Sequence, residues 1–110
     1  MLSRKHRLPL RSKLYRLERT GKRFHTPSAT LLISQQNPPS LSRFAFVVSR
    51  RLDKRATRRN RTKRLLSQAI QQLLPEIKPG LDVVVYARKI IMTERVEDVL
   101  SEIRSLLEKS

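Results

Sequence analysis

A run of seven residues, Leu81 to Ala87, reads LDVVVYA and is nearly continuous in apolar side chains, with three consecutive valines. Such a run is typical of a central strand that is buried on both faces of a sheet. The turn residues Lys78-Pro79-Gly80 stand directly before it. A fold built around this strand needs further strands beside it and helices packed against the sheet.

Two other segments have strand signals. Ser28 to Ser34 is a short β-prone run, and Gln35 to Ser42 carries the turn sequence Asn-Pro-Pro-Ser. Arg43 to Ser49 alternates in polarity, so that one face of a strand would carry Phe44, Phe46 and Val48. We predict that the two runs pair as an antiparallel hairpin with a long loop. A further short strand is expected within Leu31 to Arg43, because three strands are few for such a sheet.

Three segments have helix signals. Ser12 is a suitable N-cap and Gly21 a suitable C′ residue for a short first helix. Thr57 to Leu74 has an apolar and a polar face at helical spacing, and Pro75 ends the pattern. A last helix is predicted over Thr93 to Leu107. The order helix, strand, strand, helix, strand, helix predicts an α+β fold, an α/β sandwich with helices layered on a small sheet.

The length and the residue types limit the class of protein. A chain of 110 residues has the size of one domain, and we assign residues 12–110 to it and residues 1–11 to a basic, flexible extension. The absence of cysteine excludes disulfides and thiolate metal sites. No apolar stretch resembles a secretory signal or approaches the ~20 residues of a membrane helix. We therefore expect a cytoplasmic protein that has no membrane partner. The free protein is also expected to be monomeric, although the sequence itself is silent on the oligomeric state.

The residue types of protein-based catalysis are sparse. His6 and His25 are isolated in the sequence, and only Gly21 and Gly80 are available for a phosphate-binding loop, which is too few. The acids of the last helix form one face, for which solvation is a better explanation than acid–base chemistry; they are Glu94, Glu97, Asp98 and Glu102. We expect no catalytic residue, no metal site and no cofactor held by protein side chains alone.

The charge is distributed very unevenly. The chain has 25 Lys and Arg against 9 Asp and Glu, a formal net charge of +16. Residues 1–64 hold 19 bases and two acids, whereas residues 65–110 hold six bases and seven acids. Self-repulsion on this scale destabilises a compact protein, so a polyanionic partner is the natural explanation.

Arg50 to Arg64 holds nine bases in fifteen residues, more than solubility requires. Its second half begins the predicted helix from Thr57, where the helix dipole and the free N–H groups favour acids over bases. A sequence keeps bases there when an anion binds, because guanidinium groups and N–H groups then converge on phosphates. The pattern predicts a nucleic-acid site. Charge alone does not distinguish RNA from DNA, or a structural RNA-binding protein, such as a ribosomal one, from a processing factor.

Three blocks then resemble a known family. They are Phe44-Ala-Phe-Val-Val-Ser-Arg-Arg-Leu, Arg59-Asn-Arg-Thr-Lys-Arg-Leu-Leu and Asp82-Val-Val-Val-Tyr-Ala-Arg88. In this order and at similar spacing they resemble the bacterial ribonuclease P protein subunit, over about residues 8–107. The resemblance implies the element order αβββαβα, a sheet of about four mainly antiparallel strands, three helices and a left-handed βαβ crossover. That hand would be an exception to the usual rule.

The resemblance also implies a function. The family protein binds a large catalytic RNA, and the two together remove the 5′ leader from precursor tRNA with magnesium ions held in the complex with RNA. The expected partners are ribonuclease P RNA and precursor tRNA, and DNA is not expected. Catalysis would come from the RNA, while the protein would supply positioning and electrostatics. The alternative is a structural RNA-binding protein, such as a ribosomal one. Only the three ordered blocks favour the ribonuclease P subunit over this alternative.

Site residues follow from the motif and from the charge. The RNA-binding candidates are Arg50, Arg51, Lys54, Arg55, Arg58, Arg59, Asn60, Arg61, Lys63, Arg64 and Arg88. The family often has a further arginine where Ser67 stands, which predicts one RNA contact missing or moved.

The resemblance places the 5′ leader in a cleft between the first helix and the sheet. The candidates for this cleft are Arg11, Leu14, Tyr15, Phe24, Phe44 and Phe46. The family's first helix often offers aromatic residues, of which the matching region here has Tyr15. For Phe44 and Phe46, core packing is the favoured alternative, whereas Tyr15 and Phe24 are better candidates for stacking on bases.

Overall fold

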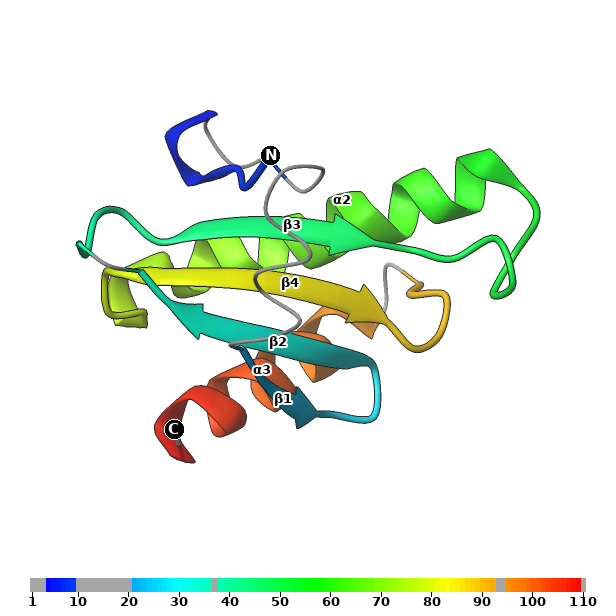
Figure 1. Cartoon of the computed structure of the whole chain (residues 1–110). Helices are drawn as coiled ribbons and strands as arrows, with labels where there is room; N and C mark the ends of the chain where they lie inside the picture. The colour runs from blue at the N-terminus through cyan, green and yellow to red at the C-terminus, as the bar shows by residue number, and fades with distance from the viewer. Residues whose placement is uncertain (1–3, 10–20, 37, 93–94, 110) are drawn as a thin grey trace.

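The computed structural model describes residues 4–9, 21–36, 38–92 and 95–109 (Figure 1). In these residues the chain forms two short 3-10 turns, four strands and two α-helices: η1 (Arg4–His6), β1 (Lys22–His25), β2 (Ala29–Gln35), β3 (Arg43–Val47), α2 (Ala56–Leu73), η2 (Leu74–Glu76), β4 (Leu81–Ala87) and α3 (Val96–Lys109). The predicted first helix, over residues 12–21, lies almost wholly outside the described residues. Among the described helices none is long and apolar enough to cross a membrane.

The four strands form one sheet in the order β1-β2-β4-β3. The strand β4 lies inside the sheet, antiparallel to β2 and parallel to β3, with Val85 opposite both Leu31 and Phe46. Val84 and Val85 point to opposite faces, and both side chains are fully buried. The prediction of a central strand over Leu81 to Ala87, buried on both faces, is therefore confirmed.

The predicted hairpin between the second and third strands is wrong. β2 and β3 do not pair with each other; β4 lies between them, and the sheet is mixed because β3 and β4 are parallel. The physical reason lies in β4, because a strand that is apolar on both faces buries most surface when it has a neighbour on each side. The additional strand was also misplaced, since β1 covers Lys22–His25 and not part of Leu31 to Arg43.

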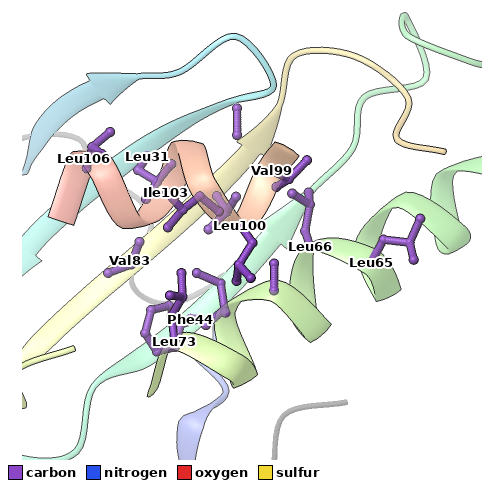
Figure 2. Close-up of a cluster of buried hydrophobic side chains, with 14 of the residues drawn as sticks. Leu31, Phe44, Leu65, Leu66, Leu73, Val83, Val99, Leu100, Ile103 and Leu106 are labelled. Atoms are coloured by element: carbon purple, nitrogen blue, oxygen red, sulfur yellow. The ribbon is translucent and has the colours of Figure 1, made fainter. Parts of the chain in front are cut away.

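One face of the sheet carries the main hydrophobic core (Figure 2). The helices α2 and α3 lie side by side behind the sheet in Figure 1 and cover this face. Leu66 and Leu73 of α2 and Ile103 of α3 meet Phe44 and Val83 of the sheet there. The apolar stripe predicted for the second helix is thus the part that anchors it.

The opposite face carries a smaller apolar cluster of Leu32, Ala45 and Val84, joined by Leu8 from the N-terminal segment. The backbone N–H of Leu8 donates to the carbonyl oxygen of Phe44 at 2.9 Å, and Leu8 is 6% exposed. The ring of His6 also bonds the carbonyl oxygen of Ser42. Residues 4–9 of the segment predicted as a flexible extension thus lie along the edge of β3, and the rest of that segment falls outside the described residues.

Candidate nucleic-acid interface

The basic segment forms a connector followed by the first turns of α2. The strand β3 ends at Val47, and α2 begins at Ala56. We call the two parts together the basic surface, defined by the residues Arg50, Arg51, Lys54, Arg55, Arg58, Arg59, Asn60, Arg61, Lys63 and Arg64. All of these are exposed except Arg59 and Lys63, which are half-buried. The structure therefore brings ten of the eleven RNA-binding candidates together on adjoining stretches of chain.

The helix holds these bases in fixed positions because its other side is buried. Thr62 stands between Arg61 and Lys63, yet its side chain is fully buried. Its Oγ1 accepts a hydrogen bond from the backbone N–H of Ile91 at 3.1 Å, which ties α2 to the loop after β4. The bases are thus displayed on a rigid element and not on a loose tail.

The first turn of α2 favours an anion. Its N-cap residue, Arg55, makes no side-chain hydrogen bond to the helix, and the first turn contains no acid. The free N–H groups and the positive end of the helix dipole therefore add to the charge of the guanidinium groups. Within residues 50–64 the one acid is Asp53, whose carboxylate accepts the backbone N–H of Arg55 at 2.8 Å and pairs with Arg58 at 3.5 Å.

Arg59 has a structural contact in addition to its place in the motif. Its Nη1 donates to the backbone oxygens of Asp53 at 3.0 Å and Lys54 at 2.9 Å. Through these bonds the helix holds the connector against its own first turns. Neither bond follows from the motif alone, because they depend on how the connector folds back.

The remaining RNA-binding candidate, Arg88, follows β4. Its Nη1 donates to the carbonyl oxygen of Thr26 at 3.0 Å, which fixes the side chain against the turn between β1 and β2. The end of β4 and the start of α2 lie at the same end of the molecule in Figure 1. A small cavity of about 80 Å³ is lined by Arg58 and Arg61 together with residues 90–92 of the loop after β4.

The aromatic candidates for the leader cleft that come from the strands lie on the helix-covered face. Phe44 is 3% exposed inside the main core, so the prediction that it faces a cleft is wrong and the core-packing alternative holds. Phe24 and Phe46 are half-buried and pack against the same core. All three occupy strand positions that point toward α2 and α3. Arg11, Leu14 and Tyr15 lie outside the described residues.

The opposite face of the sheet holds a residue that the sequence reasoning missed. Tyr86 packs half-buried against the smaller apolar cluster, and the Arg23 guanidinium lies 6.0 Å from the centre of its ring. The strand period was the available signal: in β4, Tyr86 follows Val85 and so must face away from the main core.

Ser67, where the family often has arginine, is 1% exposed. It lies on a buried side of α2, and so this position offers no surface to an RNA in this chain. The departure from the family pattern therefore fits the way this helix is packed.

Among the described residues no group of three or more His, Asp or Glu side chains could hold a metal ion.

A small α+β domain that displays nine bases around the start of one helix has the charge pattern typical of nucleic-acid-binding proteins. Comparison with known proteins identifies the family within this class. A family model described as Ribonuclease P matches residues 2–110. The chain belongs to the ribonuclease P protein family.

Individual relatives agree. The ribonuclease P protein component of Microcystis aeruginosa is 34% identical over 108 residues, covering 96% of this chain and 90% of the relative. That of Synechococcus elongatus is 42% identical over 84 residues, covering 74% and 69%. Among solved structures, the Thermotoga maritima RNase P protein is similar, with a TM-score of 0.78, 26% identity, and coverage of 94% of this chain and 96% of that one. The fold found here, a four-stranded sheet with helices on one face, is thus the fold of this family.

Proposed function

We propose that the basic surface is where this ribonuclease P protein binds the catalytic RNA. The single observation that carries the proposal is the display of nine bases on a connector and helix that are anchored in the core from behind. Phosphates of a folded RNA present fixed positions, and matching bases on a rigid helix bind them with less loss of conformational freedom than a flexible tail. Asn60, exposed among the bases, adds a donor and an acceptor for a ribose or a base edge.

The 5′ leader of precursor tRNA is proposed to bind the other face of the sheet. This face lacks α2 and α3, and it offers the Tyr86 ring beside Arg23. An aromatic ring next to a guanidinium suits an unpaired base and its phosphate. Tyr86 therefore replaces Phe44 as the stacking candidate from the sheet, while Arg11, Leu14 and Tyr15 remain candidates from the sequence.

The protein's share of the reaction is proposed to be electrostatic. Magnesium ions held by RNA would supply the chemistry of 5′ cleavage. The described residues around the basic surface are cationic donors, which suit phosphate oxygens and not a metal ion. By neutralising phosphates the protein would favour tight assembly of enzyme and substrate when magnesium is scarce.

Three finer features belong to the same proposal. The crossover from β3 through α2 to β4 is inferred to be left-handed: in Figure 1 both strands point the same way, β4 lies below β3, and α2 passes behind them, which supports that hand. The free protein is proposed to be monomeric. Its place of action is proposed to be the cytoplasm, in line with its bacterial relatives.

Reconstitution tests the proposed function. The protein is mixed with a bacterial ribonuclease P RNA and a precursor tRNA at low magnesium, and 5′ cleavage is measured. The wild type is expected to stimulate cleavage, and Arg58→Ala with Arg61→Ala to lose most of the stimulation. The matched control, Lys78→Ala with Arg104→Ala, removes the same charge away from the basic surface and is expected to behave like the wild type. If both double variants lose stimulation of 5′ cleavage equally, the stimulation depends on the overall positive charge of the protein and not on the basic surface.

A further inference from the structure

One carboxylate, that of Asp53, stands in the chain among the residues of the basic surface, and its presence requires an explanation. Asp53 is the only acid between Glu18 and Glu76 and stands among the nine bases of Arg50 to Arg64. A negative charge there repels RNA phosphates and reduces the net charge that attracts them. On electrostatic grounds alone, the chain would bind RNA more tightly without it.

The contacts of Asp53 show what the carboxylate does in the protein. Its side chain is 14% exposed, so it is turned into the connector and away from solvent. One oxygen accepts the backbone N–H of Arg55 at 2.8 Å, two residues on, which is the hydrogen bond of an Asx turn. The other oxygen pairs with the Arg58 guanidinium at 3.5 Å. A single side chain thus fixes the residue before the helix and one base of its first turn.

The helix completes this arrangement from its own side. Arg59 Nη1 donates to the backbone oxygens of Asp53 and Lys54, and so the connector is held both by its own carboxylate and by the helix. Arg55, Arg58 and Arg59 are helix neighbours whose like charges repel one another. The Asp53 carboxylate offsets this repulsion in the free protein and keeps the bases in one arrangement before RNA arrives.

We propose that Asp53 is a positioning residue of the RNA-binding surface, which it pre-organises through Arg55 and Arg58. The inference rests on the proposed RNA-binding role of the basic surface. It has an unusual consequence: removal of a negative charge from a protein that binds a polyanion weakens the complex. The gain in attraction is smaller than the loss from freeing the connector, because bases that must be ordered on binding contribute less affinity.

Two substitutions at this position separate charge from geometry. Asp53→Ala and Asp53→Asn remove the same charge, but the asparagine side-chain oxygen can still accept the Arg55 N–H. Affinity for ribonuclease P RNA is measured over a salt series at a temperature where circular dichroism shows each variant folded. Glu76→Gln is the matched control, because it removes one acid at the other end of α2, where Glu76 pairs only with Arg104 among the contacts found.

The positioning role predicts an order of RNA affinities among the variants. Asp53→Ala binds about fivefold to tenfold more weakly than the wild type, and its slope of log affinity against log salt falls by about 0.7–0.9, the loss of one phosphate contact. Asp53→Asn recovers most of the affinity, and Glu76→Gln binds as tightly as the wild type or slightly more so. Equal affinities of the alanine and asparagine variants, or tighter binding by Asp53→Ala, would overturn the positioning role.

The test is also separable from the proposed function. Arg58→Ala with Arg61→Ala is measured in the same series. If that double variant binds RNA like the wild type, the basic surface is not the RNA site and both proposals fall. If it binds weakly while Asp53→Ala binds as tightly as the wild type, only the role of Asp53 is refuted.

Discussion

Thr62 lies inside the basic motif, between Arg61 and Lys63, but its contacts give it a structural role that one substitution can isolate. Its side chain is fully buried, and Oγ1 accepts the backbone N–H of Ile91, which is 2% exposed. Thr62→Val keeps the shape and removes the acceptor. A buried N–H left without a partner costs about 1–3 kcal/mol.

That cost predicts a measurable loss of stability without loss of RNA affinity. For a chain of this size, about 1 kcal/mol lowers the melting temperature by about 4 °C, so Thr62→Val is expected to melt about 4–12 °C below the wild type. Thr62→Ser is the control, since it keeps the hydrogen bond and loses one methyl group, worth about 0.8 kcal/mol.

The assay combines thermal unfolding by circular dichroism with RNA binding at a temperature where both variants are folded. The affinity of Thr62→Val for ribonuclease P RNA is expected to stay within about twofold of the wild type, because the side chain points away from the basic surface. An unchanged melting temperature would refute the role of the Ile91 bond. Weak RNA binding by the folded variant would show that residue 62 takes part in RNA contact.

Three further outcomes are expected. Ile70→Ala, which empties a fully buried site between α2 and the sheet, should cost about 2–5 kcal/mol in the free energy of unfolding, measured by urea denaturation. Ser67→Arg should lower stability and leave RNA affinity no higher, because the position is 1% exposed; a gain in affinity with unchanged stability would contradict this. Tyr86→Ala should weaken binding of precursor tRNA by about 1–3 kcal/mol and leave binding of leaderless tRNA unchanged, as measured with the assembled enzyme; an equal effect on both substrates would exclude leader stacking.

The parts of the fold that the sequence predicted are those with strong local patterns. The valine run of β4 is buried on both faces as its pattern predicts, and α2 ends at Leu73, two residues before Pro75. The basic surface could also be located, because nine bases in fifteen residues stand out from the rest of the chain and the apolar stripe of α2 indicates which side of the helix is buried.

The remaining features depend on contacts between distant residues. The sequence of β1, KRFH, has little strand signal, because three of its four side chains stand exposed or at the sheet edge. The pairing of β4 with both β2 and β3 depends on competition for neighbours, which no single segment reveals. For the same reason the alternation around Phe44 showed that one face was apolar but not that α2 and α3 cover it.

In the functional site, the role of Asp53 could not be predicted from the sequence. In the sequence Asp53 is one acid that lowers the charge of a basic run. Its hydrogen bond with the Arg55 N–H and its ion pair with Arg58 form only when the connector folds back on the helix. The double role of Arg59, as a motif residue and as a donor to the connector backbone, is hidden in the same way.

Binding of ribonuclease P RNA across a salt titration tests most directly whether the basic surface holds the RNA. The wild type is compared with Arg58→Ala plus Arg61→Ala and with the control Lys78→Ala plus Arg104→Ala, and the two double variants each lose two positive charges. We predict that the first double variant lowers the slope of log affinity against log salt by about 1.4–1.8, the loss of two phosphate contacts, while the control keeps the wild-type slope. Identical slopes for the two double variants would contradict RNA binding by the basic surface.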